Sequence, residues 1–466
     1  MAQYNQVTPE IVEKLQAIAP GRVYTGADVN EDYSRDEMPI YGTRMPDVAI
    51  DAMSTEEISA IMKICNENHI PVTCRGAGTG LAGACTPIAG GVVICTMKMK
   101  KILSYDTDNF TVTVQPGVLL NDLAEDALKQ GLLYPPDPGE KFATLGGNVS
   151  TNAGGMRAVK YGATRDYVRS MTVVLPSGEV VKFGSSVSKT SSGYSLLNLM
   201  IGSEGTLGII TELTLKLIPA PKVTVSLIVP YESLPDAIAT VPQFKKAHMN
   251  PQALEFFERE ILISSEEYLG KAVFPRNVGG TDVGAYLLVT FDGETQEEID
   301  AIVEKAAELV LDAGALDVLV ADTPAKMKDA WAARSSFLEG IEEQTKLLDE
   351  CDVVVPTSRI ADFVGYVKSI EPEFGFAVKS FGHAGDGNLH IYTCANDMEL
   401  DEFKKQVDTF MTKIYDKATE MGGLVSGEHG IGMGKIEYLA RSVGETNMKL
   451  MEDIKKVFDP NLILNP

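Results

Sequence analysis

The sequence predicts an α+β protein with two main domains, the second of them built on an antiparallel sheet. Three observations support this prediction. The chain has 466 residues, which is too long for one ordinary hydrophobic core. Residues 46–221 alternate short apolar strands with amphipathic helices, and residues 222–425 alternate longer strands with acidic helices. We expect a first domain over 1–221, a second over 222–425, and a C-terminal helical segment over 426–466 that returns to the first domain.

The first domain begins with a strand and a capped helix. Ser54 follows the strand "PDVAIDAM", and Glu57 stands three residues later, a spacing typical of a capping box. Ile58, Ile61 and Cys65 then fall on one helical face. Two further apolar runs, "IPVTCR" and "GGVVICTM", predict strands at 70–75 and 90–97.

The remaining elements follow in order along the chain. A helix is predicted over 119–130, ending before Gly131, and an alternating strand over 213–221 ends in prolines. In the second domain, "VTVSLIVP" and "GAYLLVTFDG" predict strands, and "TQEEIDAIVEKAAELVLDAG" predicts a helix. The last 40 or so residues are expected to be largely helical.

Charge and composition exclude several classes of protein. The formal net charge is −24, whereas nucleic-acid binding requires a basic surface. No stretch has the features of a secretory signal, and the longest apolar runs are too short to span a bilayer, so we expect a cytoplasmic protein without a transmembrane segment. The six cysteines have no zinc or iron–sulfur spacing.

A glycine-rich loop, "RGAGTGLAG" at 75–83, follows one predicted strand. Gly78, Gly80 and Gly83 satisfy G-x-G-x-x-G, but a dinucleotide fingerprint must then open a helix. The following "ACTPIAGGVV" contains a proline and two adjacent glycines, which exclude a long helix. We therefore exclude classical NAD binding by this loop. A Walker A loop is also excluded, because no Gly-Lys-Ser/Thr follows.

The loop retains the chemistry of an anion site, and a second segment shares it. Backbone N–H groups in tight turns form anion-binding concavities that only small residues allow a ligand to approach. "ATLGGNVSTNAGG" at 143–155 is similarly rich in donors and free of bulky side chains. The alternative is that both segments are ordinary turns. Two such segments in one domain, together with "GSEGTLGIITELTLKL" at 202–217, favour a site that binds a pyrophosphate from both sides.

These motifs give the chain its resemblance to a known family. The chain resembles the FAD-linked D-2-hydroxy-acid dehydrogenases, which are flavoproteins of the vanillyl-alcohol-oxidase type. The resemblance covers nearly the whole chain and is carried by "RGAGTGL", "PPDPGEKFATLGGNVSTNAGG", "YGATRDYV", "GSEGTLGI", "FGHAGDGNLH" and "SGEHGIG". It implies a two-part FAD-binding domain and a substrate or cap domain with an antiparallel sheet.

The resemblance also implies a set of cofactor residues. The first loop would wrap the FAD pyrophosphate, and the other two segments would line its opposite side and the flavin. The implied residues are Arg75, Gly76, Ala77, Gly78, Thr79, Gly80, Pro138, Gly139, Thr144, Gly147, Asn148, Ser150, Gly155, Glu204, Gly205, Gly208 and Ile210. Some relatives attach FAD through a histidine in the first loop, and since 75–83 contains none, we expect noncovalent FAD.

Three of the five histidines stand beside glycine-rich turns near the C-terminal end. His383 and His390 would meet in space if the intervening "AGDGN" turned back on itself. Glu428 adds a carboxylate, and a His₂Glu set with open positions suits Zn²⁺, Mn²⁺ or Fe²⁺. Such a metal would help because an unassisted alcohol has a pKa of about 16, which a bound metal lowers by several units. The alternative is that both histidines only bond loop carbonyls.

The remaining site residues follow from the needs of 2-hydroxy-acid oxidation. His429 is the candidate base for the hydroxyl proton, a role that the resemblance supports. Arg334 is the candidate partner of the substrate carboxylate, since a guanidinium binds carboxylates in bidentate fashion, although a surface arginine is the alternative. Asn388 and Tyr194 are weaker candidates for the substrate pocket. Trp331, the single tryptophan, is expected in the core.

Several functions remain open at this stage. The main hypothesis is oxidation of D-lactate to pyruvate, with glycolate and D-2-hydroxyglutarate as alternative substrates. Because no NAD site or iron–sulfur cysteines are evident, electrons would leave to an acceptor such as an electron-transferring flavoprotein or an iron–sulfur subunit. A flavin-carrying electron-transfer subunit without its own catalysis is the alternative from another class.

Overall fold

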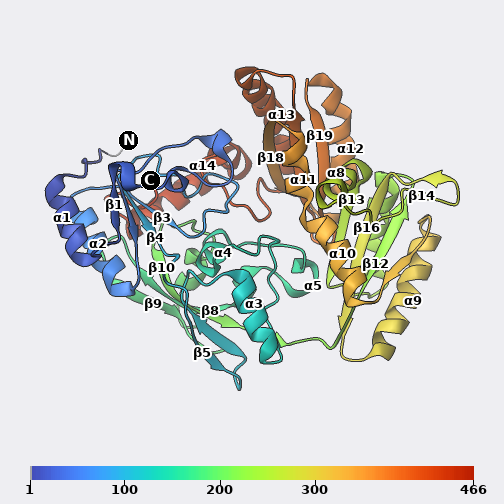
Figure 1. Cartoon of the computed structure of the whole chain (residues 1–466), viewed down its shortest axis with the longest axis horizontal. Coiled ribbons are helices and arrows are strands. Elements are labelled where there is room, and N and C mark those ends of the chain that lie inside the picture. Colours follow the sequence, from blue (N-terminus) through green and yellow to red (C-terminus); the bar gives the residue numbers. More distant parts are fainter. Residues whose placement is uncertain (1–2) are drawn as a thin grey trace. The chain divides into compact units, whose positions relative to one another are not determined.

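A computed structural model of the chain describes residues 3–466 (Figure 1). These residues form two compact units. Unit 1 comprises residues up to Gly154, Ala163–Ala220 and Glu428–Pro466, and unit 2 comprises Gly155–Gly162 and Pro221–Gly427. Residues 1 and 2 of the predicted first domain lie outside the described part. No helix between residues 3 and 466 is both long and apolar enough to cross a membrane.

Unit 1 contains two larger sheets, in agreement with the predicted two-part domain, and a two-stranded sheet of β7 (Leu132–Leu133) and β11 (Ile218–Pro219). The first has the order β1-β2-β4-β3, in which β2, β4 and β3 are parallel and β1 is antiparallel to β2. Its strands are β1 (Val23–Thr25), β2 (Val48–Asp51), β3 (Val72–Arg75) and β4 (Val92–Cys95), and it packs with α1 (Pro9–Ile18) and α2 (Thr55–Glu67) around one apolar core.

The start of α2 differs in one detail from the predicted capping box. Ser54 caps the helix as expected, and its Oγ accepts the N–H of Glu57 at 3.2 Å. The Glu57 carboxylate, however, accepts from the N–H of Met53 at 2.8 Å and pairs with Arg22 at 2.6 Å. Arg22, which lies 35 residues away in the sequence, thus binds the carboxylate that the capping box would use. The local sequence pattern does not reveal this contact.

The second sheet of unit 1 is antiparallel and has the order β5-β6-β10-β8-β9. Its strands are β5 (Ile102–Asp106), β6 (Thr111–Val114), β8 (Val168–Val174), β9 (Val180–Gly184) and β10 (Ile209–Lys216). The short helix α4 (Leu145–Thr151) packs against β10, and α3 (Leu120–Lys129) ends before Gly131, whose φ of +70° fits the predicted helix end. The C-terminal helix α14 (Ile436–Phe458) also belongs to unit 1.

Unit 2 is built on a seven-stranded antiparallel sheet, as predicted. Its order is β17-β12-β16-β13-β19-β20-β18. The strands are β12 (Val223–Tyr231), β13 (Ala253–Glu258), β16 (Ala285–Gly293), β17 (Leu319–Ala321), β18 (Leu347–Val354), β19 (Ala377–His383) and β20 (Asn388–Ala395). The central strands are buried at nearly every position, which requires helices on both faces.

One face of this sheet is covered by helices that enclose an apolar core. Helices α8 (Arg259–Leu269), α10 (Pro324–Ser335) and α11 (Phe337–Gln344) cover an aromatic cluster that includes Phe257, Phe381 and Tyr392. Trp331 is packed against this cluster and donates from Nε1 to Ser226 Oγ at 3.2 Å, which agrees with its predicted core position. The other helices of unit 2 are α7 (Leu234–Lys246), α9 (Gln296–Asp312), α12 (Ile360–Ile370) and α13 (Leu400–Glu420).

Candidate active site

Unit 1 contains a pocket at the carboxyl ends of its parallel strands, where ligands of α/β sheets usually bind. The empty space in this pocket, including the part open to solvent, is about 1180 Å³. Its walls are the loop after β3 at 76–81, the segment around α4 at 143–151, the turn before β10 at 204–210, and the pair Glu428 and His429. Three glycine-rich segments that are distant in the sequence thus form one concave site.

Asp36 holds the loop after β3 from one side. Its Oδ2 accepts the N–H of Gly83 at 2.6 Å, and its Oδ1 accepts the N–H of Met38 at 3.0 Å. Burial raises the pKa of the Asp36 carboxyl, although these backbone amides and Arg75 act in the opposite direction. This carboxylate fixes the end of the loop, whose residues 76–81 line the pocket.

Arg75 lies behind the same loop. Its Nη1 donates to the backbone carbonyl of Arg35 at 2.6 Å and to the sulfur of Cys85 at 3.2 Å. The guanidinium packs so closely against Gly78 that a Cβ there would overlap it, and Gly78 has a φ of +82°. Arg75 therefore supports the loop from beneath, and only glycine is tolerated at position 78.

The second wall is organised by the start of α4. Thr144 caps this helix, and its Oγ1 accepts the N–H of Gly147 at 3.2 Å. Asn148 is buried and lines the pocket, and its side-chain nitrogen has no hydrogen-bond partner among residues 3–466. A buried donor without a partner costs about 1–3 kcal/mol, so the geometry provides a place for a ligand acceptor.

The third feature of the pocket is the loop that carries Glu428 and His429. His429 Nε2 lies 3.7 Å from Glu428 Oε1. The loop is anchored two residues later, where Glu204 Oε1 accepts the N–H of Ile431 at 2.8 Å and Oε2 accepts that of Gly432 at 2.7 Å. Burial raises the pKa of Glu204, while these two amides act to lower it.

Unit 2 brings His383 and His390 together. They stand on β19 and β20, which form a hairpin through the turn at 384–387, and Gly387 in this turn has a φ of +90°. The two Nε2 atoms lie 3.5 Å apart, and the ring centroids lie 5.3 Å apart. The predicted turning back of the glycine-rich stretch is thus seen in the structure.

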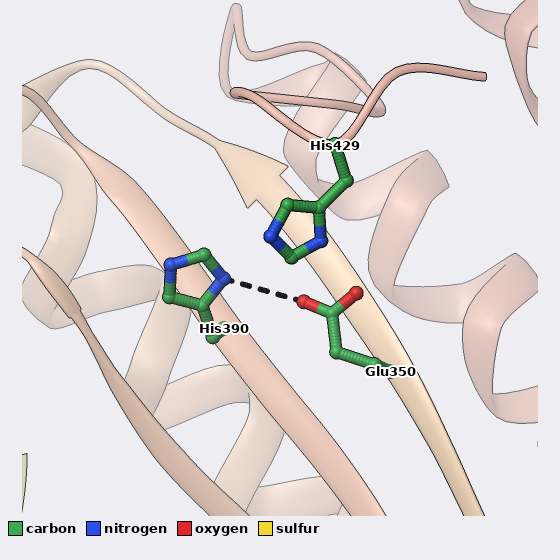
Figure 2. A group of neighbouring side chains, drawn as sticks. All are labelled: Glu350, His390 and His429. Atoms are coloured by element: carbon green, nitrogen blue, oxygen red, sulfur yellow. Dashed lines mark hydrogen bonds and ion pairs between the residues drawn. The ribbon is translucent and has the colours of Figure 1, made fainter. Parts of the chain in front are cut away.

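Each of these histidines is oriented by a buried carboxylate. Glu255 on β13 lies opposite His383, whose Nδ1 is 2.8 and 2.9 Å from the two carboxylate oxygens. Glu350 on β18 lies 3.3 Å from His390 Nδ1, as Figure 2 shows for this pair. When Nδ1–H donates to a carboxylate, Nε2 carries a lone pair. Two such lone pairs facing each other suit a cation, and metal-binding histidines usually have this second partner.

Glu255 also binds Arg334. Arg334 Nε and Nη2 lie 2.8 and 2.6 Å from Glu255 Oε2. Burial acts to raise the pKa of Glu255, but its interactions with His383 and Arg334 outweigh burial and hold the pKa below its ordinary value. The guanidinium carbon also lies 4.8 Å from the centroid of the Phe381 ring. The edge of Arg334 formed by Nε and Nη2 is therefore occupied by Glu255.

Two protein-family models match the chain. Residues 220–466 match the family described as "FAD linked oxidases, C-terminal domain", and residues 46–184 match "FAD binding domain".

The chain belongs to the FAD-linked oxidases.

Curated members of this family match the whole chain. A D-lactate dehydrogenase of Anaerostipes hadrus is 67% identical over 464 residues, covering 100% of this chain and 98% of the relative. Glycolate oxidase subunit GlcD of Bacillus subtilis is 37% identical, covering 99% and 96%. A D-2-hydroxyglutarate dehydrogenase of Stutzerimonas stutzeri is 30% identical, covering 98% of both chains. The chain is thus an FAD-linked oxidoreductase.

A solved structure establishes the fold. p-Cresol methylhydroxylase with bound substrate aligns with a TM-score of 0.80 at 19% identity, covering 100% of this chain and 98% of that chain. The predicted architecture of the vanillyl-alcohol-oxidase type is thereby confirmed.

The pocket of unit 1 fits FAD in this FAD-linked oxidase. Its walls include two glycine-rich segments, which allow a ligand to approach the backbone closely, and the buried side-chain nitrogen of Asn148, which has no hydrogen-bond partner among residues 3–466. Every predicted cofactor residue lines it except Arg75, Gly139 and Gly155. Arg75 is behind the first loop, and Gly155 begins the short segment that groups with unit 2. Direct contacts with FAD and its noncovalent attachment stay predictions.

Two of the predicted pocket residues have other surroundings. Asn388 Nδ2 donates to Asp352 Oδ1 at 2.6 Å and to the carbonyl of Val353 at 3.1 Å, so its amide nitrogen already joins two strands. Tyr194 is 96% exposed and lies outside the lining of the unit 1 pocket. The local sequence gives no burial signal at either position, and their roles toward substrate stay predictions.

Sequence reasoning missed Glu255, Glu350 and Asp36. Glu255 and Glu350 interrupt apolar strands, "ALEFFE" and "LLDECDVVV". Because an ionisable residue is rarely buried without a partner, these positions carried a usable signal for a buried charged cluster. Asp36 gives no such signal, since it lies in a polar stretch.

Replacement of Gly147 by leucine is expected to lower the FAD content of the purified protein by at least about tenfold, because a side chain here occupies ligand space. Within 4 Å, a Cβ at Gly147 would meet only Thr144 Oγ1, at 3.1 Å, so the threonine side chain would have to shift by a few tenths of an ångström. The measurement is the flavin-to-protein absorbance ratio. Gly365→Leu, on α12 with nothing within 4 Å, is the matched control. Full flavin content in Gly147→Leu would contradict the assignment of this wall.

Proposed function

We propose that the chain catalyses the oxidation of a D-2-hydroxy acid, with D-lactate converted to pyruvate. The observation that carries this choice of substrate is the 67% identity, over the full length, with a D-lactate dehydrogenase. The substrate must lose a hydride from Cα and a proton from its hydroxyl group. When bound, FAD supplies the two-electron acceptor for the hydride.

The chain's own residues provide the proton chemistry and the orientation of the substrate. His429 lines the cofactor pocket, and in this proposal it accepts the hydroxyl proton. Arg334 orients the substrate carboxylate. Because Glu255 occupies its Nε and Nη2 edge, Nη1 is the nitrogen left for the substrate, so the contact is narrower than the bidentate contact that the sequence suggested.

We further propose that His383, His390 and Glu428 hold one divalent metal, Fe, Mn or Zn. One support is the pair of histidine Nε2 atoms, which lie 3.5 Å apart while a carboxylate contacts each Nδ1. The other is Glu428, which follows Gly427 in the sequence. The N–H of Gly427 donates to Asp352 at 3.0 Å. A divalent metal supplies Lewis-acid chemistry, which lowers the pKa of an alcohol that no side-chain base reaches alone.

Electrons then leave to a partner protein such as an electron-transferring flavoprotein or an iron–sulfur subunit, in the cytoplasm. Support comes from the loop after β3, which leads to β4 without an intervening α-helix and so lacks the context of an NAD site. None of the six cysteines, all of which lie within residues 3–466, forms a disulfide, and their spacing has no iron–sulfur pattern.

Two alternative substrates are favoured by specific relatives. Glycolate follows from the glycolate oxidase subunit, and D-2-hydroxyglutarate from the dehydrogenase of that name. A non-catalytic electron-transfer subunit is the alternative from another class, and the clustered His383, His390 and Glu255 argue against it.

The decisive experiment is anaerobic reduction of the purified flavoprotein by a panel of 2-hydroxy acids of both chiralities. We expect bleaching of the flavin absorbance by D-lactate, with L-lactate inactive as the control. Faster bleaching by glycolate or D-2-hydroxyglutarate would reassign the substrate. No bleaching by any 2-hydroxy acid, in a protein with full flavin content, would favour the electron-transfer subunit.

Replacement of Glu255 by glutamine is expected to weaken divalent metal binding by about 10–100-fold, the usual effect of losing a carboxylate that orients a metal-binding histidine. Glutamine keeps the shape but removes the charge that both His383 and Arg334 face. Competition against a chromogenic chelator measures the affinity. The matched control is Glu258→Gln on the same strand, where the carboxylate binds Lys368 at 3.0 Å. Equal affinity in Glu255→Gln and wild type would contradict the role of Glu255.

A further inference from the structure

Glu204 lies where three segments of the pocket wall meet. Its backbone N–H donates to the carbonyl of Ser150 in α4 at 2.7 Å, and its own carbonyl accepts from Asn465 Nδ2 at 2.7 Å. Its two carboxylate oxygens accept the N–H groups of Ile431 and Gly432 at 2.8 and 2.7 Å. One residue thus bonds the second cofactor wall, the C-terminal segment and the loop that carries His429.

The contact with that loop is close and demands a particular backbone. Gly430 has a φ of +85°, and a Cβ at this position would lie 2.9 Å from the Glu204 carboxylate. The carboxylate therefore packs into the turn that directly follows His429. Because it also holds the next two backbone amides, movement of Glu204 would move the 428–432 loop.

Glu204 itself is held in a conformation that a side chain disfavours. Its φ is +51°, in the left-handed region that glycine, asparagine and aspartate occupy more readily. Surrounding contacts must maintain such a residue, and this kind of backbone strain is concentrated at functional sites. The bonds to Ser150 and Asn465 are the contacts that fix its backbone.

Asn465 connects Glu204 to the first cofactor loop. Besides Glu204, its Nδ2 donates to the carbonyl of Ala84 at 2.9 Å, and Ala84 lines the pocket. The Asn465 N–H donates to the carbonyl of Val72 on β3 at 2.7 Å, and the Val72 N–H donates to the carbonyl of Ile463 at the same distance. The C-terminal segment thus runs beside β3 and ties its loop to Glu204.

We propose that Glu204 is a positioning residue that fixes the 428–432 loop against the cofactor pocket, and that Asn465 fixes Glu204 in turn. The resemblance implied that Glu204 borders FAD, and Glu204 does line the pocket. All four of its polar atoms also bond to the protein, and through the bonds of its carboxylate it acts on the loop. The expected effect on catalysis rests on the proposed function, in which His429 takes the substrate proton.

The test is Glu204→Gln in the full-length flavoprotein. Glutamine offers one acceptor oxygen and places an NH₂ group against the second backbone amide, so one of the two bonds to the loop is lost. We expect FAD content to stay at the wild-type level and amide hydrogen exchange to accelerate at residues 428–434. Flavin reduction by D-lactate should slow by about 10–100-fold in kcat with little change in KM, the effect of misplacing a catalytic group by about 1 Å.

Glu212→Gln is the matched control, since Glu212 lies further along β10 and does not line the pocket. It should behave as wild type. Unchanged exchange and unchanged kcat in Glu204→Gln would overturn the inference. Faster exchange at 428–434 with unchanged kcat would support the positioning role and instead contradict the proposed role of His429.

Asn465→Asp tests the same connection from the other side and guards against a Glu204 variant that fails to fold. Aspartate tolerates the φ of +43° at this position but cannot donate to the carbonyls of Ala84 and Glu204. We expect faster exchange at 428–434 and an FAD dissociation constant raised about tenfold, as for loss of one or two hydrogen bonds. The control is Asn461→Asp. Asn461 lies in the same C-terminal segment as Asn465, and its side chain donates to Asn66 instead. Equal effects of both variants would overturn the connection through Asn465.

Discussion

Replacement of His429 by asparagine is expected to slow reduction of the bound flavin by D-lactate by about 10²–10⁴-fold, the usual span for loss of a general base. FAD content should not change, because the cofactor walls at 76–81 and 143–151 are formed by other segments. Asparagine keeps a polar side chain of similar reach but cannot accept the hydroxyl proton. Anaerobic stopped-flow measurement of flavin bleaching, with FAD content determined in parallel, gives both quantities.

A matched control for this variant is His248→Asn, the same substitution at an exposed histidine in unit 2. It should be reduced at the wild-type rate. If His429→Asn also retained the wild-type rate, His429 would not be the base. Loss of FAD from His429→Asn would show that the residue serves the cofactor pocket rather than the proton transfer.

Alanine substitution of His383, His390 or Glu428 is expected to remove the bound metal and to slow flavin reduction strongly. Loss of a direct ligand should weaken metal binding by more than the roughly 100-fold that loss of an orienting carboxylate can cause. FAD content should stay near wild type for the two histidine variants, since neither histidine lines the pocket of unit 1. Elemental analysis and anaerobic stopped-flow reduction are the paired measurements.

The wild-type protein offers an independent test of the same site. Treatment with a chelator should lower the rate of reduction by D-lactate, and addition of Mn²⁺, Zn²⁺ or Fe²⁺ should restore it. Glu258→Ala is the control for loss of a partly buried carboxylate on the neighbouring strand. A wild-type enzyme that is free of metal and is reduced at full rate would contradict the metal role. His383 and His390 would then serve only to hold the hairpin together.

The local sequence was sufficient wherever one segment decides the outcome. Ser54 caps α2, Gly131 follows α3, and the turn between His383 and His390 closes a hairpin, because the backbone conformations at these positions depend on nearby residues. The failure of the first glycine-rich loop to open a helix was also evident from its own proline and glycines. The fold type, in contrast, came from a resemblance carried by several motifs together.

The partners of the histidines could not be found in this way. Glu255 stands 128 residues before His383, and Glu350 stands 40 residues before His390, so they meet only through strand pairing in the seven-stranded sheet. Register decides which side chains share a face, and a shift by one residue would place each carboxylate on the opposite face. Arg334 likewise met Glu255 through the packing of α10 on that sheet.

The sequence by itself therefore determined part of the chemical inventory of this FAD-linked oxidase: the glycine-rich walls, the three histidines near the C-terminal end, and Glu428. Tertiary structure alone decided which atoms these groups use. In the folded protein, Arg75 binds the carbonyl of Arg35 behind its loop, and Glu255 occupies one edge of Arg334. All four polar atoms of Glu204 form hydrogen bonds within the protein. The physical reason is that a buried polar atom must find a partner, and the folded neighbours, which are distant along the chain, are what satisfy it.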